Sequence, residues 1–271
     1  MKLAFSTVGC PDWTFQDIFA AAKDFGYDAI EIRGIGNEIS APKLNIFNES
    51  NINSTMEKLK NAGLDISMLA SNAVIGFPTI AETGKAEAFE YIDLAAKINT
   101  KFVRILISPR PETDDVDTDS AVLSYNEICE YGKTKGVTPL IETNGVFADS
   151  KVLAEFMQKI SSENKGVLWD INHPCRYFNE TAKQTFENIG EYVKYLHIKD
   201  SVFNPETKKI EYKPVGYGDL PIFDIIKLMS ASGYDGVLSL EWTKRWCREL
   251  EDADIVFAQY VSYMRYLMGK L

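Results

Sequence analysis

The chain alternates between short apolar runs and longer segments with helical spacing, and each pair takes roughly 25 to 40 residues. The runs are apolar along most of their length, which is typical of parallel strands buried on both faces. Strands are predicted at residues 3–6, 29–32, 65–70, 102–107, 137–142, 166–170, 193–198 and 236–241. Strands that alternate with helices in this way predict a closed (β/α)8 barrel, the TIM barrel.

The segments between the runs carry signals for helix ends. Thr14-x-x-Asp17 and Ser54-x-x-Glu57 have the spacing of capping boxes, which begin helices. A final helix over residues 252–267 is expected to close the outer ring against the first. Four glycines stand close before predicted strands, where a residue with positive φ ends a helix without a Cβ penalty: Gly26, Gly63, Gly136 and Gly233.

The main alternative to a closed barrel is an open, doubly wound sheet. Such sheets often carry GxGxxG or GxxxxGK[ST] after the first strand, and this sequence contains neither pattern. A closed barrel needs roughly 250 residues. The 271 residues are therefore expected to form one domain over residues 1–271.

Composition narrows the class of partner and the compartment. With 45% hydrophobic and 25% charged residues, the chain has the balance of a soluble globular protein. The net charge of -10 argues against a nucleic-acid partner, since binding a polyphosphate requires a field of lysine and arginine. No apolar run approaches the roughly 20 residues of a membrane span. Four cysteines without CxxC spacing favour a reducing compartment, so a cytoplasmic protein is expected.

Side chains that can bind a metal end four consecutive predicted strands. They are Glu142, Asp170, His197 and Glu241, each after apolar neighbours. The carboxyl ends of barrel strands meet at one mouth, where active sites are built. Any one of these residues alone could be structural, but three carboxylates at one mouth repel each other unless a cation neutralises them. The set of four therefore predicts a site for one divalent ion.

Three oxygen ligands and one imidazole suit a six-coordinate ion such as Mn²⁺, Mg²⁺ or Co²⁺, with Zn²⁺ as an alternative. Four protein ligands would leave two positions open. Neighbouring oxygens of a hydroxycarbonyl compound could occupy both, which would polarise its C–H bond toward deprotonation. The expected partner is therefore a small polyhydroxy molecule, and a homo-oligomer is left open.

Two residues near the strand ends are candidates for contact with that substrate. His173 lies three residues after Asp170 and is expected to bind a substrate oxygen, with a role in loop structure as the alternative. Lys199 lies two residues after His197 and could steady a developing enolate. Equally, Lys199 could form an ordinary ion pair with the neighbouring Asp200.

Arginine and tryptophan residues complete the set of candidates. Arg33 and Arg104 lie at or within strand ends, where a guanidinium needs an acidic partner or a polar substrate. An ion pair is the favoured role for both, and Arg104 is also a candidate for substrate binding. Glu31 would suit Arg33 only if folding brought the two together. Three tryptophans could form an apolar wall for a sugar, with simple packing as the alternative: Trp13, Trp242 and Trp246.

The strand-end phrases resemble those of the xylose isomerase-like barrels, which include sugar phosphate isomerases and epimerases, inosose dehydratases and hydroxypyruvate isomerases. IETNG contains Glu142, WDINHP contains Asp170 and His173, HIKD contains His197, and SLEW contains Glu241. The phrases occur in the family's order. The alternation of strands and helices extends the resemblance over nearly the whole chain.

The resemblance implies a metal-dependent isomerase or epimerase of a sugar or related polyhydroxy carbonyl compound. In the ketose 3-epimerase members, two glutamates bind the metal and exchange a proton with opposite faces of one carbon, which implies catalytic roles for Glu142 and Glu241. The chemistry agrees, because a cis-enediolate needs an acid/base on each side and a metal to hold its charge. Those epimerases usually carry an arginine shortly after the histidine ligand, where this chain has Ile198-Lys199-Asp200.

Three other functions are weighed against this one. A lyase of the inosose dehydratase kind could use the same metal site to expel a hydroxyl group. A non-catalytic sugar-binding barrel could keep the pocket without the metal. Related barrels that cut abasic DNA bind several metals through many histidines, and the two histidines of this chain argue against that activity.

Overall fold

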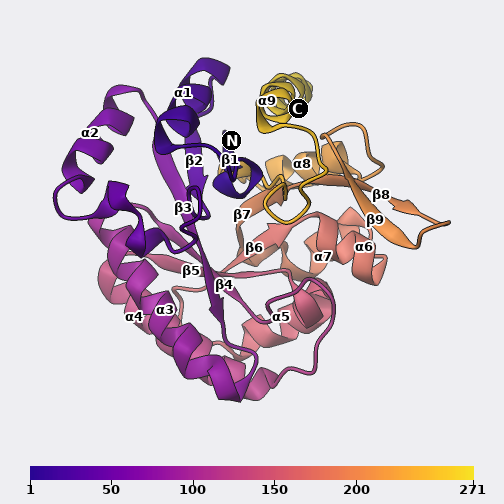
Figure 1. The fold of residues 1–271 in the computed structure, drawn as a ribbon. Helices are drawn as coiled ribbons and strands as arrows, with labels where there is room; N and C mark the ends of the chain where they lie inside the picture. The colour runs from indigo at the N-terminus through magenta and orange to yellow at the C-terminus, as the bar shows by residue number, and fades with distance from the viewer.

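Parallel strands close into a ring in the computed structural model, which describes residues 1–271 (Figure 1). The order around the ring is β1 (Lys2–Ser6), β10 (Val237–Leu240), β7 (Val193–Ile198), β6 (Gly166–Asp170), β5 (Thr138–Glu142), β4 (Phe102–Leu106), β3 (Asp65–Val74) and β2 (Ala29–Ile32). Each of the eight predicted strands corresponds to one of these. The predicted TIM barrel is therefore confirmed.

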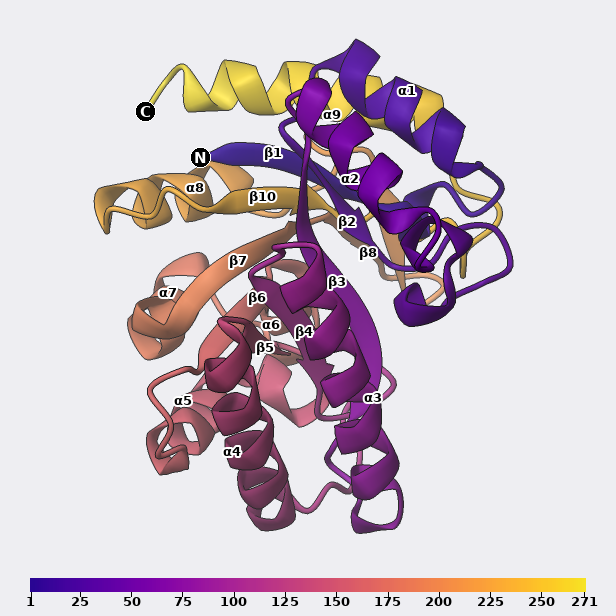
Figure 2. The same ribbon diagram turned by 90° about the vertical axis from the view of Figure 1, so that its left-hand side faces the viewer.

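Helices surround the ring on its outside (Figure 1). They are α1 (Phe15–Phe25), α2 (Ile52–Asn61), α3 (Pro78–Lys97), α4 (Thr118–Lys135), α5 (Ser150–Lys159), α6 (Asn172–Phe178), α7 (Ala182–Ile189), α8 (Ile222–Ala231) and α9 (Ala253–Met268). In Figure 2, α9 lies beside α1, so the last helix closes the outer layer against the first, as expected. No helix has the length and apolarity that crossing a membrane would require.

The interior of the ring is filled by an apolar layer that lies directly beneath the polar strand ends. Side chains two residues apart on a strand share a face. Two residues further along their strands, Glu142, Asp170 and His197 therefore point into the ring like Leu140, Leu168 and Tyr195. The buried apolar layer itself consists of Met68, Ala70, Leu140, Leu168 and Tyr195. A larger apolar core lies between the ring and the helices.

Most of the predicted helix ends are present. Thr14 and Asp17 form a capping box, in which the backbone N–H of each donates to the other's side chain at 2.9 and 3.3 Å. The four glycines expected to end helices all have positive φ, from 70° to 85°. Such angles cost glycine little and other residues more.

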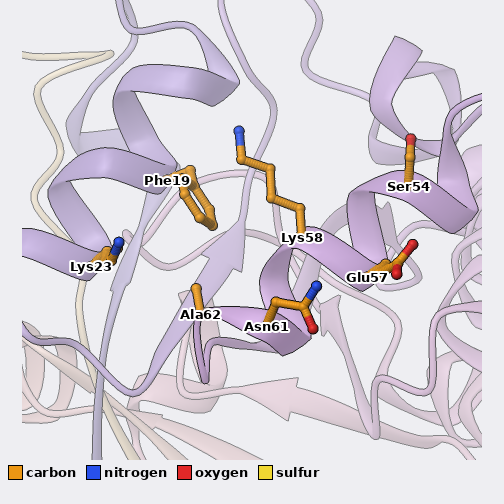
Figure 3. A pocket seen from close by; sticks show the side chains of 7 residues that line it. All are labelled: Phe19, Lys23, Ser54, Glu57, Lys58, Asn61 and Ala62. Carbon is orange, nitrogen blue, oxygen red and sulfur yellow. The ribbon is translucent and has the colours of Figure 1, made fainter.

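The capping box predicted at Ser54 and Glu57 is wrong. Helix α2 begins at Ile52, so Ser54 lies inside its first turn and donates to the carbonyl of Asn51 at 2.8 Å. Ser54 and Glu57 instead line a groove of about 490 Å³ between α1 and α2, on the outside of the barrel (Figure 3). Lys58 lies 4.3 Å from the ring centre of Phe19 there, so its charge is already engaged.

Two strand features differ from the prediction. Strand β3 continues to Val74 rather than ending at residue 70, with a register shift against β4 between Ala70 and Val74. After β7 the chain forms an antiparallel hairpin of β8 (Asp200–Asn204) and β9 (Lys209–Lys213), which projects from the ring in Figure 1. Because it follows the carboxyl end of β7, the hairpin lies on the side of the mouth.

Candidate active site

The four strand-end residues predicted to share a metal lie together at the mouth of the barrel. Glu142 and Asp170 end β5 and β6, His197 lies in β7, and Glu241 directly follows β10. One ligand atom from each lies within 4.8 Å of the others, and all four side chains are buried. They converge because the parallel ring turns all its carboxyl ends to one side.

His197 is oriented by Glu31, a carboxylate that the strand-end pattern missed. The Nε2 atom of His197 lies 3.0 Å from Oε2 of Glu31, which also accepts a hydrogen bond from Oγ of Ser239 at 2.9 Å. Burial acts to raise the pKa of Glu31, but the charge and the hydrogen bond of His197 together outweigh it and the pKa is lowered. Glu31 is thus an ionised acceptor, and Nε2 of His197 carries the hydrogen.

The other ring nitrogen of His197 is buried and has no hydrogen-bond partner. Nδ1 lies 3.6 Å from Oε2 of Glu241 and 3.9 Å from Oε1 of Glu142. Buried polar atoms are normally paired, so an orphan of this kind needs an explanation. An imidazole held through Nε2–H by a carboxylate presents its other nitrogen as a metal ligand. The residues present therefore fit one divalent ion, held by Nδ1 and three carboxylates.

Two buried cations, Lys199 and Arg104, lie against the carboxylates. Nζ of Lys199 is 2.6 Å from Oδ2 of Asp170 and also contacts Glu241. Nη1 of Arg104 is 3.2 Å from Oε2 of Glu142 and 3.6 Å from Oε1 of Glu241. Burial acts to raise the pKa of Glu241, but Lys199 and its other cationic neighbours outweigh it and hold the pKa well below its usual value. Glu241 is therefore kept ionised in a buried site.

His173 lies at the edge of the same cluster. Its Nδ1 atom is 2.9 Å from the carbonyl oxygen of Thr143, which can only accept, so Nδ1 carries the hydrogen. The opposite nitrogen, Nε2, is 3.5 Å from Oδ2 of Asp170. His173 thus presents Nε2 to the mouth, where contact with a substrate oxygen stays a prediction.

The suggested ion pair between Lys199 and Asp200 is wrong. Neighbouring residues on an extended chain point to opposite sides, so Asp200 turns away from the cluster. Its carboxylate accepts backbone N–H groups from Gly216 and Gly218 at 2.8 and 2.9 Å. A Cβ at position 218 would lie 2.0 Å from Oδ1 of Asp200, so glycine is required for this approach. Asp200 therefore fixes the loop that follows the hairpin.

The ion pair expected for an arginine is confirmed for Arg104 and wrong for Arg33. Glu31, the suggested partner of Arg33, is taken by His197. Nη2 of Arg33 donates instead to Oδ1 of Asn72, and no carboxylate lies within 4.0 Å of its guanidinium.

The tryptophans lie against other parts of the fold. Trp13 packs edge-on to Phe257 of α9, with 5.6 Å between ring centres. Trp242 is buried and donates from Nε1 to the carbonyl of Glu251 at 2.9 Å. Trp246 is 60% exposed. These contacts favour packing roles for Trp13 and Trp242.

Replacing Glu31 by glutamine should weaken metal binding by about 10- to 100-fold, because the amide holds the His197 ring less firmly than a carboxylate does. Calorimetric titration with Mn²⁺ measures the change. Glu130→Gln, on the exposed face of α4, is the matched control and should bind like the wild type. Wild-type affinity in Glu31→Gln would show that Glu31 does not support the ligand.

Metal binding should also strengthen as the pH rises, because of His197. Burial acts to lower the pKa of His197, but the charges of Glu31 and Glu241 outweigh it and raise the pKa to about 9. Below that pH the ring carries a proton that binding must release, so apparent affinity should fall about tenfold per pH unit. Calorimetric titration with Mg²⁺ from about pH 6 to about pH 8 measures how the apparent affinity changes with pH. Repeating it in two buffers with different enthalpies of protonation measures how many protons are released on binding. A flat profile without proton release would contradict the expectation.

Comparison with known proteins places this geometry in a family. The family model described as the xylose isomerase-like TIM barrel matches residues 19–259 of this chain. Fructoselysine 3-epimerase of Escherichia coli O157:H7 is 22% identical over 260 residues, 92% of this chain and 93% of that protein. An uncharacterised protein of Methanocaldococcus jannaschii is 28% identical over 118 residues, which cover 42% of this chain and only 39% of that protein.

Solved structures show the same fold at low sequence identity. The IOLI protein with a bound zinc atom has a TM-score of 0.79 at 15% identity, covering 100% of this chain and 99% of its own. The probable 3-DHS dehydratase AsbF of Bacillus anthracis has a TM-score of 0.79 at 17% identity, and the match covers 98% of this chain and 99% of that protein. Because the family model spans most of the chain, this protein belongs to the xylose isomerase-like TIM barrel family.

Proposed function

We propose that this protein isomerises or epimerises a sugar or related polyhydroxy carbonyl compound by proton transfer, with one divalent metal ion bound. The placement of Glu142 and Glu241 carries the proposal. Glu142 ends β5 and Glu241 follows β10, two strands that β6 and β7 separate in the ring, and both side chains approach Nδ1 of His197. Two buried carboxylates on different sides of one site suit proton exchange with both faces of a carbon. The similarity to a fructoselysine 3-epimerase supports the same class.

A bound divalent ion would supply positive charge to the neighbouring oxygens of the substrate. One glutamate, in its ionised form, removes the proton from the carbon next to the carbonyl group, and the other, after taking up a proton from solvent, donates it to the same carbon from the opposite side. Arg104 lies beside both Glu142 and Glu241, so its charge can stabilise the glutamate that carries the negative charge at each stage. Lys199 adds a fixed positive charge where the enolate develops.

The ligand set favours Mn²⁺, Mg²⁺ or Co²⁺, with Zn²⁺ as the alternative, because carboxylate oxygens dominate it. His173 is proposed to bind a substrate hydroxyl group through Nε2. Trp13 is the weakest of the proposed substrate contacts, because its ring is engaged with Phe257.

Dehydration by the same site is the second candidate, and the position of Lys199 favours it. Its buried ammonium group contacts Asp170 and Glu241. After a glutamate has removed the proton next to the carbonyl group, the enolate can expel the neighbouring hydroxyl group. The ammonium group can donate the proton that lets this group leave as water.

A substrate screen in D₂O tests the proposal. Ketoses, inososes and hydroxypyruvate are incubated with the protein and added Mn²⁺, and products are identified by NMR and mass spectrometry. Isomerisation or epimerisation predicts products with deuterium on the reacting carbon and no loss of water, whereas dehydration predicts loss of water. Metal-stripped protein should be inactive and recover when metal is restored. Binding of sugars without exchange or conversion would favour a non-catalytic sugar-binding barrel.

A further inference from the structure

We propose, on the basis of the function proposed above, that the substrate carries an anionic group and that Arg33 binds it at the mouth of the barrel. Arg33 directly follows β2. The four proposed metal ligands come from the β5, β6, β7 and β10 side of the ring, whereas β1 to β4 form the remaining arc. A substrate held at the metal by its hydroxycarbonyl end would extend across the mouth toward this arc.

Arg33 is buried and largely unpaired. It is 6% exposed, and its backbone N–H donates to Oγ1 of Thr7 at 2.8 Å, which fixes its place. Among the guanidinium nitrogens only Nη2 donates a hydrogen bond, to Asn72, and Nη1 is buried without a partner. Arginine stays protonated in proteins, and a guanidinium removed from water needs a partner to offset its desolvation. Its free donors are therefore suited to an oxyanion.

The charges around the metal site leave Arg33 as the surplus cation. A bound divalent ion, Arg104 and Lys199 would together balance the charges of four buried carboxylates. Those carboxylates are Glu31, Glu142, Asp170 and Glu241. The charge of Arg33 then has no buried counterpart, and an anionic group on the substrate would supply one.

The guanidinium of Arg33 also lies within the field of the same cluster. Burial lowers its pKa to about 10, with the charge of Arg104 as the second cause, while Glu241 acts in the opposite direction. Glu87 of α3 is half-buried and accepts the backbone N–H of Asn72 at 2.7 Å, but forms no ion pair with Arg33. Arg33 is thus held beside the site without being neutralised.

A phosphate or a carboxylate has the chemistry that this position requires. Both combine negative charge with several acceptor oxygens, which the planar guanidinium binds well. A sugar phosphate and a sugar acid are therefore the two sources of the anionic group, and binding measurements separate them.

Three polyols without an aldehyde or ketone serve as probes: glucitol, glucitol 6-phosphate and gluconate. Calorimetry with the Mg²⁺-loaded protein should show one or both anionic compounds binding about 10- to 100-fold more tightly than glucitol. If only glucitol 6-phosphate binds tightly, the substrate is a sugar phosphate. If only gluconate binds tightly, the substrate is a sugar acid. Since these probes are not isomerised, the result is independent of catalytic activity.

Two variants remove the free charge of Arg33 in different ways. Arg33→Met deletes the guanidinium. Asn72→Asp keeps the volume of the side chain and gives Nη2 an internal carboxylate partner. Both should reduce the anion preference to within about twofold and leave glucitol binding unchanged. Arg245→Met is the matched control, because Arg245 is half-buried, also has unpaired guanidinium nitrogens, and should not affect the preference.

Equal binding of the three polyols by the wild type would overturn the proposal. An anion preference that survives in both variants would also overturn the proposal. The same holds for an anion preference that is lost in Arg245→Met. An anion preference lost in Arg33→Met and Asn72→Asp would support it even if the substrate screen found no turnover, in which case the proposed isomerase function would fail by itself.

Discussion

Glutamine in place of Glu142 or Glu241 should lower the turnover number by about 10²- to 10⁴-fold, because the amide cannot accept the substrate proton. The fold should remain, since glutamine has nearly the same volume as glutamate and, at position 142, its amide oxygen can still accept from Nη1 of Arg104. Steady-state kinetics with a substrate found by the screen measures the loss, and thermal unfolding measures stability.

The two glutamates should behave as a unit. The double variant is expected to be hardly slower than either single one, as is usual when residues share one catalytic step. Glu130→Gln on α4 is the control and should keep wild-type kinetics. Undiminished turnover in either single variant would reject the two-base mechanism, and a parallel loss of stability would indicate damage to the fold instead.

Methionine in place of Lys199 should destabilise the metal-free protein by about 3 to 5 kcal/mol, because removing one partner of a buried ion pair leaves its charge uncompensated. The ammonium group contacts both Asp170 and Glu241, and burial leaves no water to replace it. Saturating Mn²⁺ should offset most of the loss, since the ion would neutralise the same two carboxylates. Urea unfolding with and without metal measures both effects.

Lys213→Met is the control for this substitution. Lys213 pairs with Glu211 at 3.0 Å on the hairpin, where both side chains are more than a third exposed, so its loss should leave the unfolding midpoint near that of the wild type. Unchanged stability of metal-free Lys199→Met, or a loss that metal does not reverse, would show that Lys199 and the metal do not neutralise the same groups.

The barrel could be predicted from the sequence because each of its strands is a distinct apolar run. The predicted strand at residues 137–142 corresponds to Thr138–Glu142, and that at 166–170 to Gly166–Asp170. The hairpin of β8 and β9 was missed because residues 200–213 mix charged and aromatic side chains without an apolar run. The extension of β3 to Val74 lies beyond a register shift against β4, and pairing between two strands is not encoded in the pattern of one segment.

The proposed metal ligands could be found at strand ends, but their supporting contacts could not. Glu31 lies inside the apolar run Ala29–Ile32 rather than at its end, and its partner His197 is 166 residues away. A carboxylate within a buried strand is itself a signal, since it must find a partner. The acidic partners of Lys199 could not be predicted from its neighbours in sequence, because only the pairing of β7 with β10 brings Glu241 beside it.

A crystal structure of the protein grown with Mn²⁺, with the ion located by its anomalous scattering, tests the central claim most directly. The expected result is one ion bound by Nδ1 of His197 and by carboxylate oxygens of Glu142, Asp170 and Glu241, with Glu31 on Nε2 of the same histidine. No ion at this position under saturating Mn²⁺, or an ion bound by other residues, would contradict the claim.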